Sequence, residues 1–284
     1  MGTILVAGAR GRVGGHVAQR LLAAGASVRL MQRAEAAGAA GSSADIVVAD
    51  YDDDASMARA FSGVDAAFLY APGSPARSAA VFARARQCGV QRVVLLSSAS
   101  VAKAPPGANP IAERHRIAEQ ECKAAGMAWT FIRPDTMASN CLQWARSIRE
   151  ESRVYTYSPG AMRNPIHEDD IAWLAVDALL HERHVGRVLD ITGPGIVTIA
   201  EQVACIGAEL GRAVECVAVS REEALRRGHE ETPQLSEQAL ERLLDYLRKS
   251  ETVRPPITTD FRDALGVEPR SFRDWARDAL PSFR

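Results

Sequence analysis

Three glycines near the N-terminus stand at a spacing that suits phosphate binding. Gly8, Gly11 and Gly14 directly follow the apolar run from Ile4 to Ala7, and a helical pattern begins after them. In such a turn the first glycine permits the bend, the second lets the backbone approach a pyrophosphate, and the third lets the helix pack on its strand, with the helix N-terminus facing the anion. A plain glycine turn is the alternative. The residues predicted to bind a dinucleotide here are Gly8, Arg10, Gly11, Arg12, Val13 and Gly14.

The residue after the second predicted strand indicates which dinucleotide is preferred. Enzymes that use NAD usually carry an acidic residue here for the ribose hydroxyls, whereas this chain carries Arg33. A guanidinium suits the 2′-phosphate of NADP, and Arg10 could close on the same phosphate. Two alternatives stay open: Glu35 could bond the ribose and favour NAD, or the arginines could be solvated surface. We expect NADP(H) in preference to NAD(H).

Two later strand ends should also flank the cofactor, because ligands bind at the carboxyl edge of a parallel sheet. Asp50 and Tyr51 follow the third predicted strand, and Ala71 and Pro72 follow the fourth. Asp50 is a candidate for the adenine edge, although a turn cap explains it nearly as well.

The chain lacks the Tyr-x-x-x-Lys pattern with which ordinary short-chain dehydrogenases move a proton. The helix that should carry it instead places His115 and Glu119 one turn apart. His115 is a candidate proton donor, with Glu119 holding its other nitrogen; a solvated helix face is the alternative. Ser97 and Ser98 end the fifth predicted strand and could bond a substrate carbonyl or the nicotinamide amide, or simply cap that strand.

The missing tyrosine and lysine favour a particular acceptor chemistry. Hydride transfer to a quinone yields a stabilised anion that takes its proton from water, whereas an unactivated ketone needs a well-placed acid. We therefore expect a small, flat and conjugated substrate.

A mostly apolar substrate pocket is predicted from residues beyond the sixth strand. Simple core packing is the alternative for these side chains, and a packed loop histidine is the alternative for His167, which precedes a helix capped by Asp169 and Asp170. No metal is predicted, since no His, Cys or Asp cluster has metal-ligand spacing. The pocket residues are Met137, Asn140, Trp144, Tyr155, Tyr157, Met162 and His167.

The elements that must position these residues alternate between short β-branched runs and Ala-rich helices, which is typical of successive βαβ units. Strands are expected at about 3–7, 27–32, 45–49, 64–70, 92–97 and 128–132. The fold class is α/β, a Rossmann-type doubly wound parallel sheet with a small C-terminal α/β lobe over the carboxyl edge. Residues 1–134 should form the NAD(P)-binding core, and 135–284 should hold the rest of the core, 170–192, interleaved with a substrate-binding lobe.

Composition narrows the class of protein. The formal net charge of −1 gives no general attraction to nucleic acid or membranes. The five cysteines lack the close pairing of a disulfide framework, and the first residues do not form a signal peptide. We expect a cytoplasmic monomer or homodimer.

Together these residues resemble the atypical short-chain dehydrogenases, specifically the NmrA-like NAD(P)H-binding group, which includes quinone oxidoreductase-like enzymes and cofactor-sensing regulators. The resemblance rests on the glycine turn, Arg33, Ser97 to Ala99, Gly126 to Pro134 and Pro165 to Ile171. It implies that Arg33 meets the 2′-phosphate of NADP and that Pro134 lies beside the nicotinamide.

Three functions follow as hypotheses. The leading one is an NADP-dependent oxidoreductase that transfers hydride to a quinone-like or conjugated carbonyl compound. The second is a regulatory binding protein that senses the ratio of NADPH to NADP and acts on a protein partner. The third is a biosynthetic cyclase or isomerase without net redox change.

Overall fold

The computed structural model describes residues 2–33, 45–233 and 235–284. Contacts divide the chain into two compact units. Unit 1 comprises Met1–Asp135, Glu168–Ile191 and Thr259–Val267, and unit 2 comprises Thr136–His167, Thr192–Thr258 and Glu268–Arg284.

Unit 1 is built on a seven-stranded sheet in the order β11-β6-β5-β4-β1-β2-β3, with every neighbouring pair parallel. The order reverses between β1 and β4, which is where a doubly wound sheet opens its binding crevice. The predicted fold class of a Rossmann-type parallel sheet is confirmed. The strands are β1 Thr3–Ala7, β2 Val28–Gln32, β3 Asp45–Val48, β4 Val64–Tyr70, β5 Arg92–Leu96, β6 Ala128–Pro134 and β11 Val188–Ile191.

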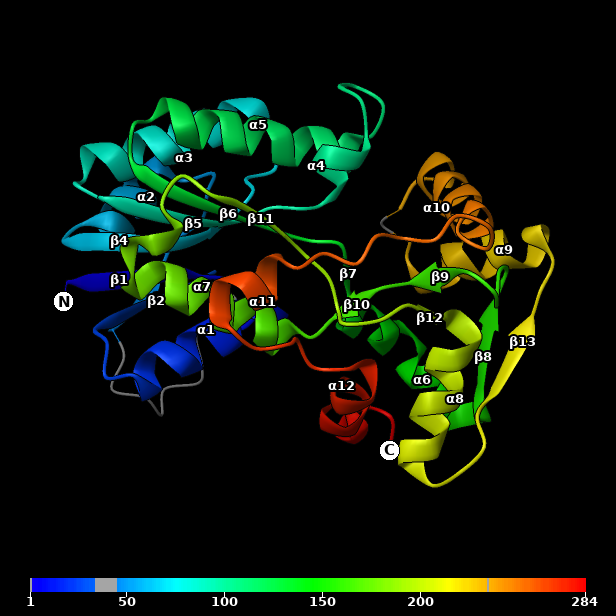
Figure 1. Ribbon diagram of the computed structural model, residues 1–284. Coiled ribbons are helices and arrows are strands. Elements are labelled where there is room, and N and C mark those ends of the chain that lie inside the picture. Colours follow the sequence, from blue (N-terminus) through cyan, green and yellow to red (C-terminus); the bar gives the residue numbers. More distant parts are fainter. Residues whose placement is uncertain (1, 34–44, 234) are drawn as a thin grey trace. The chain divides into compact units, whose positions relative to one another are not determined.

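Helices cover both faces of this sheet (Figure 1). One face carries α2, α3 and α5, and the other carries α1, α7 and α11. The reason is visible in α1, where Val13, Val17 and Leu21 recur at helical spacing and are buried. The helices are α1 Arg12–Ala23, α2 Asp54–Phe61, α3 Pro75–Gln87, α4 Ser100–Lys103, α5 Pro110–Ala124, α7 Glu168–Leu180, η3 Glu182–His184 and α11 Asp260–Leu265.

Two boundaries differ from the sequence expectation. Strand β6 continues to Pro134 rather than ending near 132, so Pro134 belongs to the strand. Helix α7 begins at Glu168, so Asp169 and Asp170, which were expected to cap this helix, lie in its first turn. Acidic residues in a first turn interact favourably with the helix dipole.

Unit 2 combines three two-stranded sheets with helices around its own core. The pairs are β7 with β10, β9 with β12, and β8 with β13. The core includes Ile148, Val154, Ile206, Trp275 and Phe283. The elements are β7 Thr136–Met137, η2 Ala138–Trp144, α6 Ala145–Glu151, β8 Arg153–Thr156, β9 Met162–Arg163, β10 Pro165–Ile166, β12 Val197–Thr198, α8 Ile199–Leu210, β13 Glu215–Ala218, α9 Arg221–Glu231, α10 Glu237–Lys249, α12 Phe272–Asp278 and η4 Leu280–Ser282.

Within the described ranges, no helix is both long enough and apolar enough to cross a membrane. The same residues contain no group of three or more His, Cys, Asp or Glu side chains placed to hold a metal ion.

Candidate active site

The glycine turn between β1 and α1 has the geometry that its sequence predicts. Gly8 has a φ of +61°, and the amide of Gly11 donates to the carbonyl of Gly8 at 2.7 Å. A Cβ on Gly14 would lie 2.3 Å from that carbonyl oxygen, so the third glycine is required for the close approach of helix to turn. Gly11 is the N-cap of α1 and supplies no side-chain acceptor to the first turn of the helix.

The side chains of this turn divide into two kinds. Arg10 and Arg12 are exposed, whereas Val13 is buried in the core of unit 1. Val13 is therefore positioned to offer a cofactor its backbone amide only, and the two arginines remain predicted phosphate ligands.

Tyr70, at the end of β4, is part of the turn and was not among the predicted residues. Its hydroxyl accepts a hydrogen bond from the amide of Gly14 at 3.0 Å. Its ring packs so closely on Gly8 that a Cβ there would lie 2.4 Å from the ring carbon Cε2. Burial raises the pKa of Tyr70 and keeps its hydroxyl protonated. The sequence signal was only a tyrosine at a strand end.

Arg33 immediately follows β2 and is exposed, as a ligand for a 2′-phosphate must be before cofactor binds. Glu35, which could favour NAD instead, lies outside the described residues.

A cavity of about 290 Å³ lies beside the loops that follow β3 and β4, with Asp52 and Ser74 among its lining residues, whereas Asp50 and Ala71 do not line it. Tyr51 lines it, and its hydroxyl accepts a bond from the amide of Tyr70 at 3.4 Å. Burial raises the pKa of Tyr51 far above its ordinary value. The Asp50 carboxylate accepts a bond from the amide of Asp52 at 3.0 Å, which is the turn-capping arrangement. Pro72 is buried and Ala71 is half-buried.

At the end of β5, Ser97 belongs to a buried polar network. Its hydroxyl lies 2.5 Å from Oε1 of Glu119 on α5. The same carboxylate receives two bonds from Arg133 on β6, at 2.8 and 2.6 Å. Ser97 and Glu119 are 3% and 4% exposed. A carboxylate paired with a guanidinium can only accept, so Ser97 donates its proton to Glu119 and is left with lone pairs alone.

This geometry limits what Ser97 can bind. Of its two predicted partners, a substrate carbonyl requires a donor, whereas the nicotinamide amide offers N–H groups to an acceptor. Only the second is compatible with the bond to Glu119. Ser98, by contrast, accepts a bond from the amide of Ser100, the first residue of α4, at 3.2 Å.

The expected hydrogen bond between His115 and Glu119 is wrong. The Glu119 carboxylate is taken by Ser97 and Arg133, and Nδ1 of His115 is buried without a partner. Spacing along a helix brought the two residues onto one face, but contacts from neighbouring strands captured the carboxylate. Burial, helped by the positive charge of Arg114, lowers the pKa of His115 to about 4. The imidazole is therefore neutral near pH 7. Its one remaining N–H group can still donate a hydrogen bond.

A further ionisable residue, missed in the sequence, lies beside this network. Asp190 on β11 is in register with Arg133, and its Oδ1 is buried without a partner. Burial is the main cause that raises the pKa of Asp190, and Arg133 opposes it. Its amide is fixed by the carboxylate of Asp260 at 2.8 Å.

The predicted pocket residues of unit 2 lie on several elements. Met137 is on β7, Asn140 and Trp144 are on η2, and Met162 is on β9, but Trp144 packs against the core of unit 2. Tyr155 donates its hydroxyl to Glu151 at 2.6 Å, and Arg227 stacks 3.7 Å from its ring centroid. Tyr157 has Arg248 5.9 Å from its ring. Trp144 therefore packs in the core, which was the alternative to a place in the substrate pocket.

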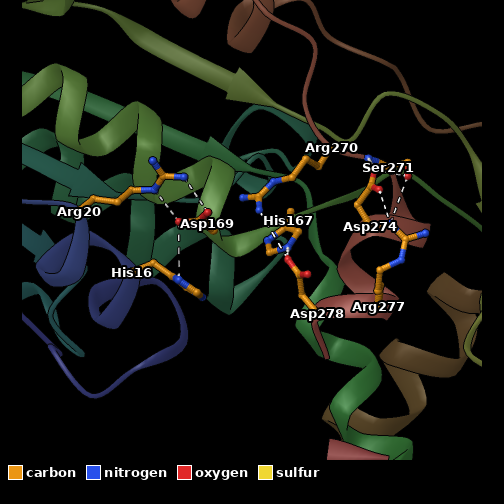
Figure 2. A network of polar contacts seen from close by, with 9 residues as sticks. All are labelled: His16, Arg20, His167, Asp169, Arg270, Ser271, Asp274, Arg277 and Asp278. Atoms are coloured by element: carbon orange, nitrogen blue, oxygen red, sulfur yellow. Dashed lines mark hydrogen bonds and ion pairs between the residues drawn. The ribbon is translucent and has the colours of Figure 1, made fainter. Parts of the chain in front are cut away.

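His167 is buried, with Nε2 3.2 Å from Oδ2 of Asp278 on α12 (Figure 2). Arg270 lies 3.7 Å from the same oxygen. These contacts fit the packed histidine that was the alternative to a pocket role. In unit 1, Figure 2 shows Asp169 held by Arg20, with contacts of 2.5 and 2.7 Å, and by His16 at 3.6 Å. Asp169 thereby ties α7 to α1, the helix that opens at the glycine turn.

Comparison with known proteins identifies the family to which this chain belongs. The model of an NAD(P)H-binding family matches residues 8–182. The chain belongs to this NAD(P)H-binding family. The resemblance inferred from the glycine turn and the later motifs is confirmed.

Two curated relatives of this protein are reductases by name. It is 34% identical, over 99% of both chains, to (4-alkanoyl-5-oxo-2,5-dihydrofuran-3-yl)methyl phosphate reductase of Streptomyces griseus. It is 31% identical, over 78% of both chains, to NAD(P)H azoreductase of Xenophilus azovorans. The predicted class, an NAD(P)H-dependent oxidoreductase, agrees with these names.

Solved structures share the fold. Triphenylmethane reductase of Citrobacter sp., complexed with NADP(H), superposes with a TM-score of 0.79 at 22% identity, covering 98% of this chain and 100% of that one. NADPH-dependent quinone oxidoreductase of Escherichia coli, complexed with NADPH, gives a TM-score of 0.75 at 19% identity, covering 98% and 99%.

Proposed function

We propose that this protein is an NADPH-dependent reductase that transfers hydride to a conjugated carbonyl compound of small size. The observation that carries the proposal is the combination of an intact glycine turn with a strand-end serine bonded to Glu119, whose carboxylate is paired with Arg133. No Tyr-x-x-x-Lys pair stands in the sequence to protonate an ordinary ketone.

The relative from Streptomyces griseus supports this acceptor class. The substrate in its name has a ring double bond conjugated with both a lactone carbonyl and an alkanoyl carbonyl. Hydride addition to the far carbon of such a double bond moves an electron pair onto oxygen and gives an enolate shared by two carbonyls. That anion is stable enough to take its proton from water.

The residues of unit 1 have distinct roles in this proposal. NADPH, when bound, supplies the hydride. The first-turn amides of α1, with Arg10 and Arg12, hold its pyrophosphate, and Arg33 holds its 2′-phosphate. Ser97 accepts from the nicotinamide amide and so fixes the ring. The neutral imidazole of His115 donates a hydrogen bond to the enolate oxygen.

Unit 2 is the proposed substrate lobe. Met137 and Met162 supply apolar surface to a flat acceptor, and Tyr157 supplies an aromatic face. The cytoplasm, which holds reduced NADPH, is the proposed compartment.

Turnover with a panel of acceptors tests the proposal. Purified protein is mixed with NADPH and an acyl butenolide, a quinone or an unconjugated ketone, and NADPH absorbance is followed. We expect consumption with the first two acceptors, little with the third, and a product heavier by two hydrogens. Tight NADPH binding without consumption of any acceptor would refute the reductase and favour the cofactor-sensing alternative.

A further inference from the structure

Arg163 on β9 is a half-buried cation in unit 2 that the proposed reaction does not yet use. Its Cζ lies 4.6 Å from the ring centroid of Tyr246 on α10. Its Nη1 lies 3.4 Å from the hydroxyl of Ser250, which donates its own proton to the carbonyl of Tyr246 at 2.6 Å. Ser250 therefore accepts from Arg163, and the aromatic ring supports one face of the guanidinium.

The charge of Arg163 has no carboxylate partner among the residues that the structure describes. Several other arginines of unit 2 do have a carboxylate partner: Arg153 pairs with Glu215, Arg221 with Asp245, and Arg248 with Glu251. A guanidinium has five N–H donors, and the weak bond to Ser250 uses one of them. A half-buried guanidinium whose N–H donors are mostly without an acceptor is stabilised by an anion that offers several oxygens.

The position of Arg163 in unit 2 connects it with the proposed acceptor. It directly follows Met162, and three residues later Ile166 pairs with Met137 in the β7 and β10 sheet. Two of the apolar residues proposed for the acceptor therefore lie on the same short stretch of strands as the guanidinium.

We propose that Arg163 binds the phosphate group of an acceptor that is a phosphate monoester. The inference rests on the proposed reductase function and specifies its substrate class. A phosphate offers three acceptor oxygens and close to two negative charges, and the planar guanidinium can meet two of those oxygens at once. Arg163 thus selects the phosphorylated acceptor and fixes its orientation, while the conjugated ring reacts elsewhere.

Matched acceptors test the assignment. Steady-state constants are measured with an acyl butenolide methyl phosphate and with the corresponding alcohol, for the wild type and for Arg163→Gln. We expect the wild type to favour the phosphate by about 10- to 100-fold in kcat/KM. Arg163→Gln should lose that preference through KM, with kcat and the constants for the alcohol little changed. Arg163→Lys should keep part of the preference, because lysine keeps the positive charge but lacks the paired N–H donors of the planar guanidinium.

Arg254→Gln is the matched control, since Arg254 is an exposed arginine of the same unit. It should leave both acceptors unchanged. If Arg163→Gln lost kcat/KM equally for the phosphate and the alcohol, Arg163 would have a structural role and the inference would be wrong. A wild type that does not prefer the phosphate would also overturn it.

Direct binding separates this inference from the proposed function. Calorimetric titration of the phosphate ester into wild type and Arg163→Gln, both confirmed folded by thermal melting, needs no turnover. Weaker binding to the variant with no turnover in either protein would retain the phosphate site and refute the reductase. Equal binding to both proteins would refute the site whatever the activity. Inorganic phosphate, titrated in parallel, should bind the wild type much more weakly than the ester.

Discussion

The hydroxyl of Ser97 and the carboxylate of Glu119 lie 2.5 Å apart across the end of β5, and Arg133 holds the other side of that carboxylate at 2.6 Å. The serine is thereby fixed as an acceptor toward any further partner. The helix that would carry the tyrosine and lysine of an ordinary short-chain dehydrogenase instead supplies the acid that orients the serine.

Breaking this pair should cost stability. Glu119→Gln leaves the half-buried guanidinium of Arg133 without the carboxylate that it bonds, so we expect the free energy of unfolding to fall by about 3 kcal/mol. Ser97→Ala removes one hydrogen bond and should cost about 1 kcal/mol. Urea denaturation of both variants measures the difference. Equal stabilities for Glu119→Gln and the wild type would contradict the buried ion pair.

His115 should make folding sensitive to acid. Burial lowers its pKa from the ordinary 6.5 to about 4, so the unfolded chain binds the proton more readily than the folded chain. The stabilising contribution is complete above about pH 6.5 and is lost as the pH falls toward 4. Urea midpoints at stepwise lower pH should therefore fall more steeply for the wild type than for His115→Gln. Parallel slopes in the two proteins would show that His115 titrates normally.

The same lowered pKa predicts a flat activity profile. Since His115 is neutral throughout the range near pH 7, kcat/KM for a conjugated acceptor should show no inflection near 6.5. A rise in activity as pH falls through 6.5, abolished in His115→Gln, would instead identify a protonated imidazole as the acid.

The sequence predicted what depends on local pattern. The glycine turn and the apolar runs of the sheet are each decided within a few neighbouring residues, and both were found. Side-chain partners were harder to predict. Helical spacing predicted a bond between His115 and Glu119. The strand order instead places Ser97 and Arg133 against the Glu119 carboxylate.

Tyr70 shows the same limit. Its role depends on β4 lying next to β1, a pairing of residues about sixty apart that no local pattern reveals. The late helix α11, which packs in unit 1, likewise left no periodic signal that could be assigned before the fold was known.

Arg33 should decide between the two dinucleotides. Arg33→Ala removes the proposed ligand of the 2′-phosphate, so KM for NADPH should rise by about 10- to 100-fold while KM for NADH changes little. Arg59→Ala, an exposed arginine on α2, is the control and should leave both constants unchanged. Equal effects of Arg33→Ala on the two cofactors would show that Arg33 does not read the 2′-phosphate.

Two adjacent glycines of α1 should respond oppositely to the same change. A Cβ on Gly14 would lie 2.3 Å from the carbonyl oxygen of Gly8, whereas a Cβ on Gly15 would meet the carbonyl oxygen of Ala9 at 3.4 Å. Gly14→Ala forces turn and helix apart, so it should lower the free energy of unfolding by about 1–3 kcal/mol and weaken NADPH binding. Gly15→Ala should raise stability by about 0.5–1 kcal/mol, because alanine favours the helix, and should leave NADPH binding intact. Denaturation and fluorescence titration of the two variants, side by side, separate close packing at the turn from helix propensity. If Gly14→Ala bound NADPH as tightly as Gly15→Ala does, the third glycine would have no part in shaping the cofactor site.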